Sequence, residues 1–215
     1  MKLFLMRHGQ AENNVRNIIS HSPGCWSLTA RGRKQVAAAA NELNESTCQI
    51  DNVLISPLLR AQETYEIMKN RCEQVQAAPV NTLESLTEIH MGDWNNRQRC
   101  AESNTLFAQR SRERRSHNFS PFRLPYGESF RELALRMTGF LSDYIVNSDT
   151  DSNLLIISHA DPLFSLQRVI KLLTNYQLPA SYPNNAEIIS IDLSMGQVSN
   201  LRRSLRGYLL QGADK

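Results

Sequence analysis

Short apolar runs that alternate with longer segments of helical character constrain the fold of this chain more than any other feature. The run Leu154-Leu155-Ile156-Ile157 is typical of a strand that is buried on both faces. The predicted strands are Lys2–Met6, Asn52–Ser56, Pro79–Leu83, Leu154–Ile157, Ile188–Leu193 and Val198–Leu205, the last two joined near Met195-Gly196. The predicted helices are Ala30–Asn44 behind an N-cap at Thr29, Pro57–Met68, Ser129–Val146 and Leu163–Leu173.

This alternation predicts an α/β fold, a three-layer α/β/α sandwich with a mostly parallel central sheet. A length of 215 residues fits a single domain, 1–215. The stretch from about 92 to 127 is basic, contains Pro121 and Pro125 and has only a weak helical pattern. Its length is unusual for a plain connection, so we interpret it as a helical or loop insertion over the active site.

Composition excludes several classes of protein. The apolar content of 41% is ordinary for a chain with a buried core, and no apolar stretch is long enough to span a bilayer. The N-terminal apolar segment is too short for a secretory signal, so we expect a cytoplasmic protein. The four cysteines are widely spread and form no C-x-x-C pair, which favours free thiols over zinc ligands or a disulfide scaffold.

The net charge of +3 is too small to indicate nucleic acid by itself, but its distribution is uneven. One arginine cluster crowds the insertion and a second lies near the C-terminus. The first is either a solvated face or a cationic lid that draws in an anionic substrate, and it lacks the interleaved aromatics of a nucleic-acid platform. The clusters are Arg97, Arg99, Arg110, Arg112, Arg114, Arg115 and Arg123, and then Arg202, Arg203 and Arg206.

Polar side chains follow three of the predicted strands directly. Arg7 and His8 follow the first strand, Arg60 follows the second, and His159 follows the run at 154–157. Ligands of parallel sheets bind outside the carboxyl ends of the strands, so these residues are expected to meet. Two arginines suit an oxyanion, and a neutral imidazole is a competent nucleophile at cellular pH.

Phosphoryl transfer also needs an acid to protonate the departing oxygen. Glu88 is the candidate that we favour, and Glu84 lies close enough in sequence to be an alternative.

At these residues the chain strongly resembles the histidine phosphatase superfamily, also called the phosphoglycerate mutase-like family. The resemblance runs from Lys2 to about Leu193, with the family's motifs in their usual order. The matching segments are R-H-G-Q-A-E-N-N at 7–14, L-T-A-R-G at 28–32, S-P-L-L-R-A-Q-E-T at 56–64, L-T-E-I-H-M-G-D-W at 86–94, G-E-S at 127–129, I-S-H at 157–159 and P-N-N-A at 183–186.

The resemblance implies a role for each matching residue. His8 would be the nucleophile that forms phosphohistidine, and Glu88 the general acid and base. Arg7, Arg60 and His159 would hold the phosphoryl oxygens, with Asn14 as a neutral donor. His21 is expected near the phosphate because it follows the R-H-G segment. The family uses neither metal nor cofactor for this reaction.

Two positions depart from the family pattern. The family commonly has glycine after its second histidine, whereas Ala160-Asp161-Pro162 follows here. Asp161 could repel anions or cap the next helix, and we favour the cap. Ala11 replaces the usual Thr or Ser. We expect His90 and His117 to be incidental, and Trp26 and Trp94 to be packing residues.

The sequence therefore predicts a phosphomonoesterase that acts on a small phosphorylated metabolite, with a phosphoprotein as a further possibility. A cofactor-dependent phosphoglycerate mutase is an alternative, although the segment after Glu88 does not match that of true mutases. A module that binds a phosphorylated ligand without turnover is another. We expect neither nucleic acid nor membrane as a partner, and the sequence leaves the oligomeric state open.

Overall fold

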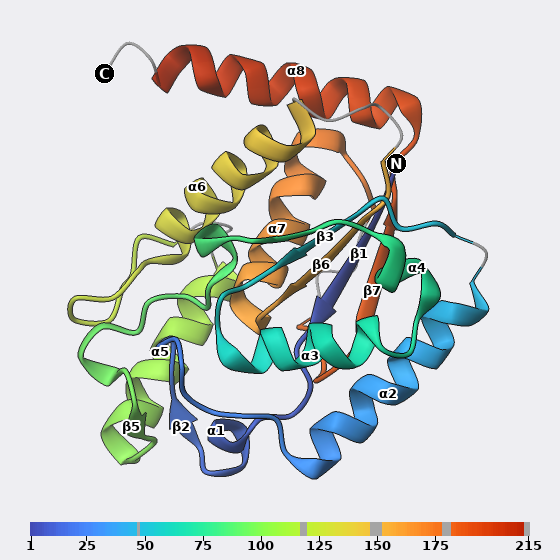
Figure 1. Cartoon of the computed structure of the whole chain (residues 1–215). Helices are drawn as coiled ribbons and strands as arrows, with labels where there is room; N and C mark the ends of the chain where they lie inside the picture. Colours follow the sequence, from blue (N-terminus) through green and yellow to red (C-terminus); the bar gives the residue numbers. More distant parts are fainter. Residues whose placement is uncertain (47, 117–119, 147–151, 178–181, 213–215) are drawn as a thin grey trace.

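The computed structural model describes residues 1–46, 48–116, 120–146, 152–177 and 182–212. A sheet with the strand order β4-β3-β6-β1-β7 runs through its centre (Figure 1). β3 pairs in parallel with β4 and β6, β6 pairs in parallel with β1, and β7 is antiparallel to β1. The sheet is mostly parallel, as predicted. Its strands are β1 (Lys2–Arg7), β3 (Asn52–Ile55), β4 (Val80–Thr82), β6 (Leu154–Ser158) and β7 (Ile188–Asp192).

Helices cover both faces of this sheet, because successive strand residues point to opposite sides. Leu3 and Leu5 pack into a core with α6, α7 and α8, whereas Phe4 and Met6 pack with α2, α3 and α4. The predicted three-layer α/β/α sandwich is confirmed. The helices are α2 (Ala30–Glu45), α3 (Leu59–Lys69), α4 (Glu73–Ala77), α6 (Phe130–Leu141), α7 (Ala160–Thr174) and α8 (Met195–Gly212).

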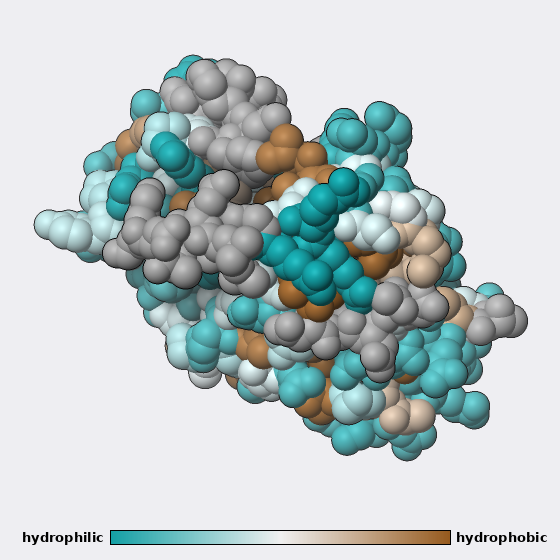
Figure 2. Space-filling view, turned by 90° about the horizontal axis from the view of Figure 1, so that it is seen from above, coloured by the Kyte–Doolittle hydropathy of each residue, from teal (hydrophilic) through white to brown (hydrophobic). Residues whose placement is uncertain are grey.

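One predicted strand is wrong. Val198–Leu205 lies within helix α8, and Met195-Gly196 begins that helix instead of forming a hairpin turn. Val198, Leu201 and Leu205 are spaced for one face of a helix and are buried in the core beside α6 and α7. The helical periodicity therefore outweighs the β-branched and aliphatic composition that suggested a strand. Figure 2 views the molecule from above Figure 1, on the side of α8, and shows hydrophilic side chains interrupted by apolar patches.

Other predicted elements differ at their ends. Ser129 is the N-cap of α6, where its side chain and that of Glu132 form a capping box. After Leu141 the helix continues as a π-helical turn, η3 (Ser142–Val146). α7 begins at Ala160, earlier than predicted.

The insertion leaves the sandwich and returns to it at one point. Gly92 has a φ of +54°, and a Cβ atom there would lie 1.9 Å from the Pro125 carbonyl oxygen, so only glycine fits. The Glu128 N–H donates to the His90 carbonyl at 2.8 Å, which closes the base of the loop. Between these ends lie η2 (Gly92–Trp94), β5 (Arg97–Gln98) and α5 (Ala101–Ser116).

The rest of the site region comes from the segments after β1 and β4. They contain α1 (Glu12–Val15), β2 (Ile18–Ile19), which pairs with β5, and the 3-10 turn η1 (Glu84–Leu86). The insertion is thereby joined to the chain that follows the first strand. All four cysteines are free thiols.

Candidate active site

The carboxyl ends of β1, β3 and β6 lie level with one another. Arg7 is in register with Ser158, and Ile55 with Ile157. His8 therefore leaves the sheet beside His159, and Arg60 enters from the first turn of α3. The His8 and His159 rings have centroids 5.1 Å apart. Residues separated by about 150 positions in the chain meet at one edge of the sheet, as the strand order predicted.

The His8 ring is held in one tautomer. Its Nδ1 lies 2.7 Å from the Gly9 carbonyl oxygen, which can only accept, so Nδ1 carries the proton. Nε2 then has a free lone pair and accepts a hydrogen bond from the Arg60 Nε–H at 3.2 Å. Burial, together with the charges of Arg60 and Arg7, holds the pKa of His8 well below 6.5. The ring is neutral, and its Nε2 carries the lone pair that a nucleophile requires.

Hydrogen bonds to backbone carbonyls fix the guanidinium groups of Arg7 and Arg60, but each group retains an unused N–H donor among the described residues. Arg60 donates from Nη2 to the Ser20 carbonyl at 3.1 Å, and Arg7 donates from Nη1 to the Pro183 carbonyl at 3.0 Å. Arg60 Nη1 and Arg7 Nε are buried and have no hydrogen-bond partner among the described residues. Burial lowers the pKa of Arg60 to about 10, so it is still cationic at neutral pH. Buried donors of this kind suit the oxygen atoms of an oxyanion.

His159 is fully buried beneath His8 and caps the start of α7. Its Nε2 lies 2.8 Å from the Ser56 hydroxyl oxygen, and its Nδ1 has no partner in the described part of the chain. Burial, then the charges of Arg60, His8 and Arg7, holds its pKa well below 6.5. His159 is therefore a neutral ring, and the hydrogen-bonding capacity of its Nδ1 is unused among the described residues.

Glu88 lines the same cavity as His8. Burial, and then the negative charge of Asp161, raises its pKa to about 7. The Ile89 N–H, which donates to Oε1 at 2.9 Å, and the cations Arg60 and Arg7 act in the opposite direction. A carboxyl group with a pKa near neutrality can both give and take a proton at cellular pH. Glu84, the alternative acid, is exposed at the start of η1 and does not line the cavity.

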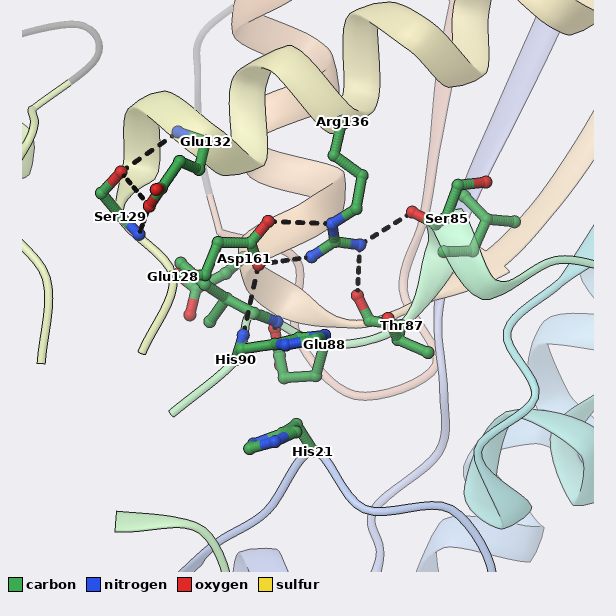
Figure 3. Close-up of polar contacts among 12 residues, drawn as sticks. His21, Ser85, Thr87, Glu88, His90, Glu128, Ser129, Glu132, Arg136 and Asp161 are labelled. Atoms are coloured by element: carbon green, nitrogen blue, oxygen red, sulfur yellow. Dashed lines mark hydrogen bonds and ion pairs between the residues drawn. The ribbon is translucent and has the colours of Figure 1, made fainter. Parts of the chain in front are cut away.

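A salt bridge behind Glu88 holds the segment that carries it (Figure 3). Arg136 donates from Nη1 to the carbonyl oxygens of Ser85 at 2.8 Å and Thr87 at 2.9 Å. Its Nε and Nη2 bind both oxygens of Glu128 at 2.9 and 2.7 Å. The planar, bidentate contact with Glu128 orients the guanidinium, and the two bonds from Nη1 hold the backbone on the N-terminal side of Glu88. Arg136 is not among the site residues predicted from the sequence.

Most of these side chains line a cavity of about 340 Å³, but His159 and Arg136 are not among its lining residues. Its floor has Arg7, His8, Arg60, Glu88 and Asn14, and its walls come from the insertion and from the start of α7. A larger surface depression, about 530 Å³, lies beside α3 and contains none of these groups. The wall residues include Met91, Arg99, Phe107, Arg110, Ser111, Ala160, Asp161 and Tyr182.

Comparisons with known proteins agree with this geometry. The profile of the histidine phosphatase superfamily (branch 1) matches residues 3–204. This chain belongs to the histidine phosphatase superfamily. Its relatives include a 2,3-bisphosphoglycerate-dependent phosphoglycerate mutase of Bartonella henselae, which is 31% identical over 90% of this chain and 88% of the mutase. The adenosylcobalamin/alpha-ribazole phosphatase of Salmonella typhimurium is 32% identical over 81% of this chain and 80% of that protein.

Solved structures of histidine phosphatases have the same fold. The alpha-ribazole phosphatase from Shigella flexneri superposes with a TM-score of 0.64 at 27% identity, over 91% of this chain and 92% of that structure. The superfamily contains both phosphatases and mutases, so membership supports an enzyme of phosphoryl transfer and leaves its net reaction open.

The two remaining candidate phosphate ligands of this superfamily member lie in different surroundings. Asn14 lines the cavity, and its Oδ1 accepts from the Ala11 N–H at 2.9 Å, which leaves the amide nitrogen as the donor. His21 does not line the cavity. Its Nδ1 accepts from the Met91 N–H at 3.1 Å, and its ring stacks on His90 with centroids 4.9 Å apart. It supports the wall at Met91.

Asp161 is not the helix cap that we favoured. The N-cap of α7 is His159, and Asp161 is the second residue of the helix. Its carboxylate accepts from Arg110 Nη2 at 3.3 Å and from the Tyr182 hydroxyl at 2.5 Å. Tyr182 is not among the residues predicted from the sequence, where the departure from the family's glycine pattern at Ala160-Asp161 was the one signal in this region.

The arginine cluster of the insertion is not a single surface. Arg110 is buried, Arg97, Arg99 and Arg112 are exposed, and Arg123 pairs with Glu132 at 3.1 Å. The side chains of Arg114 and Arg115, and all of His117, lie outside the described residues. In the described part of the chain, no helix is both long and apolar enough to cross a membrane. No cluster of His, Cys, Asp and Glu suited to a metal ion occurs there either.

Proposed function

We propose that this histidine phosphatase hydrolyses phosphate monoesters through a phosphohistidine formed on His8 Nε2. The observation that carries the proposal is the arrangement around that nitrogen. Its lone pair is fixed by the Nδ1–H contact to Gly9, and the Arg60 guanidinium that touches it has a further buried N–H without a partner. A phosphoryl group brought to Nε2 would find this donor beside it.

The reaction takes two steps. Nε2 attacks phosphorus, the bond from phosphorus to the ester oxygen breaks, and Glu88 gives its proton to the departing alkoxide. Glu88, now ionised, takes a proton from water, which attacks the phosphohistidine and releases inorganic phosphate and neutral His8. Arg7, Arg60, His159 and Asn14 donate to the equatorial oxygens in both steps, and one such donor contributes about 10²- to 10³-fold in comparable sites.

The substrate that we propose is a small phosphorylated metabolite. A cavity of about 340 Å³ is near the lower end of the roughly 300–1,000 Å³ found for small-molecule pockets. The floor supplies the donors for one phosphoryl group. The walls combine apolar groups such as Phe107 and Ile19 with hydroxyls such as Ser111.

A phosphoglycerate mutase is a second candidate, favoured by the similarity to the Bartonella henselae mutase. A mutase would return the phosphoryl group of His8 to a second oxygen of the substrate, whereas a phosphatase gives it to water. Incubation with 3-phosphoglycerate and a catalytic amount of 2,3-bisphosphoglycerate, which would phosphorylate His8 at the start, separates the two. We expect release of inorganic phosphate without formation of 2-phosphoglycerate, and rapid interconversion of the two isomers would establish the mutase.

The direct test is hydrolysis of p-nitrophenyl phosphate together with chemical trapping of the intermediate. Rapid quenching in alkali preserves phosphohistidine, and peptide mass spectrometry should locate one acid-labile phosphoryl group on His8. Lack of turnover with this ester and with a broad metabolite panel would contradict the proposal and favour a phospho-ligand binding module.

A further inference from the structure

A buried carboxylate lies in the wall of the phosphate cavity. Asp161 is 8% exposed and lines the cavity. Its Oδ2 accepts from Arg110 Nη2 at 3.3 Å, and its Oδ1 accepts from the Tyr182 hydroxyl at 2.5 Å. These contacts join the start of α7 to helix α5 of the insertion and to the segment before β7. An acidic group in a site for anions requires an explanation, because like charges repel.

Asp161 neutralises a buried cation, the guanidinium of Arg110. Arg110 is 6% exposed, and its Cζ lies 4.5 Å from the centroid of the Phe130 ring and 6.0 Å from that of Phe107. Its Nη1 contacts the Met91 sulfur at 3.8 Å, a weak acceptor. A buried guanidinium needs an anion, and Asp161 is the carboxylate recorded beside it.

The other arginines of the cavity are placed differently. Arg7 and Arg60 each have a buried N–H group at the floor without a partner among the described residues, and this is where the proposed phosphoryl group would bind. Arg99 is exposed, with its Cζ 4.6 Å from the Phe107 ring centroid. Among the described residues, Arg110 is therefore the buried cation of the wall that could bind a second anionic group of a substrate. Asp161 already neutralises its charge.

We propose that the Asp161–Arg110 pair selects phosphate monoesters whose alcohol part carries no negative charge. The pair occupies the buried cation that would otherwise bind a carboxylate or a second phosphate, and it adds a fixed negative charge to the same wall. Arg7 and Glu88 both experience the field of Asp161, so the carboxylate acts across the whole cavity. The inference rests on the proposed phosphatase function and specifies its substrate class.

Two compounds that differ in a single group test the selection in the wild-type protein. Glycerol 3-phosphate has a CH₂OH group where 3-phosphoglycerate has a carboxylate. Each is used as a competitor of p-nitrophenyl phosphate hydrolysis, so neither has to be turned over. We expect the inhibition constant of 3-phosphoglycerate to be higher by about tenfold, from like-charge repulsion at the effective dielectric of a partly buried site. Equal or tighter binding of 3-phosphoglycerate would overturn the inference.

Three variants then assign the effect to the pair. Asp161→Asn retains the size and an acceptor for Tyr182 but releases Arg110. It should shift the ratio of the two inhibition constants about fivefold or more toward 3-phosphoglycerate. The double variant Asp161→Asn/Arg110→Gln should lose this shift. Arg110→Gln alone leaves Asp161 without its cation and should increase the discrimination against 3-phosphoglycerate.

The control is Asp192→Asn, the same change at an exposed carboxylate of β7 that pairs with Lys2 at the opposite end of the strands. It should leave the ratio unchanged. An unchanged ratio in Asp161→Asn, or a shift that persists in the double variant, contradicts the inference while hydrolysis of p-nitrophenyl phosphate stands. Absence of that hydrolysis in the wild type contradicts the proposed function instead. If Asp161→Asn does not fold, the wild-type comparison and Arg110→Gln still decide.

Discussion

The floor and the walls of the phosphate cavity are built in different ways. The reactive part of the floor comes from Arg7 and His8 at the end of β1 and from Arg60 in the first turn of α3, and the register of β1, β6 and β3 brings these residues together. The walls come from the insertion, from Asp161 and from Tyr182, which meet through side-chain contacts between loops and helices. The proposed function thus places the chemistry on the rigid edge of the sheet and the selection among substrates on the attached loops.

The largest effect is expected at the floor. His8→Ala removes the atom that forms the covalent intermediate, so kcat should fall by about 10⁴-fold or more, as for other catalytic nucleophiles. Steady-state hydrolysis of p-nitrophenyl phosphate measures this loss, and thermal unfolding verifies that the variant is folded. If the variant still yields a trapped phosphoenzyme, another residue is the nucleophile. The assignment of the chemistry to His8 at the floor would then be wrong.

Replacement of the acid should have the next largest effect, and it should depend on the leaving group. Glu88→Gln cannot give up a proton, so alkyl phosphates should be hydrolysed about 10²- to 10³-fold more slowly. p-Nitrophenyl phosphate, whose leaving group needs little protonation, should lose much less in the phosphorylation step. A plot of log(kcat/KM) against the pKa of the leaving alcohol should be steeper for the variant. Parallel plots for the two proteins would mean that Glu88 is not the acid.

The position of Glu88 itself should depend on Arg136. Arg136→Lys keeps the charge but cannot bind both Glu128 oxygens and two carbonyl groups at once. We expect kcat to fall about tenfold, with KM little changed, as the carboxyl group loses its alignment. Arg131→Lys, an exposed position of the same helix, is the matched control.

A positioning role predicts more than a loss of rate. The defect of Arg136→Lys should be larger for alkyl phosphates than for p-nitrophenyl phosphate, in parallel with Glu88→Gln. A uniform loss across leaving groups would show that the salt bridge acts on the fold and not on the acid.

The same contrast explains how far the sequence predicted the site. His8, Arg60 and His159 follow apolar runs, and the ends of parallel strands meet, so their convergence could be deduced without coordinates. The pairing of Asp161 with Arg110 could not, because it depends on how α5 packs over the cavity, and the insertion has no strong periodicity. The hydrogen bond from His8 Nδ1 to the Gly9 carbonyl could not be predicted from the sequence either, because it depends on the backbone conformation just after β1.

The wrong strand prediction at Val198–Leu205 came from reading aliphatic composition without the spacing of the apolar residues. Val198, Leu201 and Leu205 are buried, and their spacing of three and four residues is that of a helix face. An interpretation based on aliphatic composition alone therefore assigned the wrong element. In the first strand, by contrast, the apolar run is continuous and short, which fits a strand covered on both faces.

The smallest expected effect concerns the coupling between wall and floor. Burial and the negative charge of Asp161 raise the pKa of Glu88 to about 7, while Arg60, Arg7 and the Ile89 N–H lower it. Glu88 must be protonated to assist phosphorylation of His8, so kcat/KM for an alkyl phosphate should fall as the pH rises through about 7. Asp161→Asn removes one of the two influences that raise this pKa. The alkaline limb should therefore move to lower pH, by about one pH unit or less because burial remains.

The sign of this shift separates two roles of Asp161. If the carboxylate only held Tyr182 and Arg110 in place, its amide would change the height of the profile but not the position of the limb. A limb that moves to higher pH would mean that the freed Arg110 charge does not reach Glu88 and that the acid has become more buried.

The profile should be recorded for Asp161→Asn and for the double variant with Arg110→Gln, which removes the freed cation. The limb of the double variant should lie between those of Asp161→Asn and the wild type, because a nearby cation also lowers the pKa of a carboxyl group.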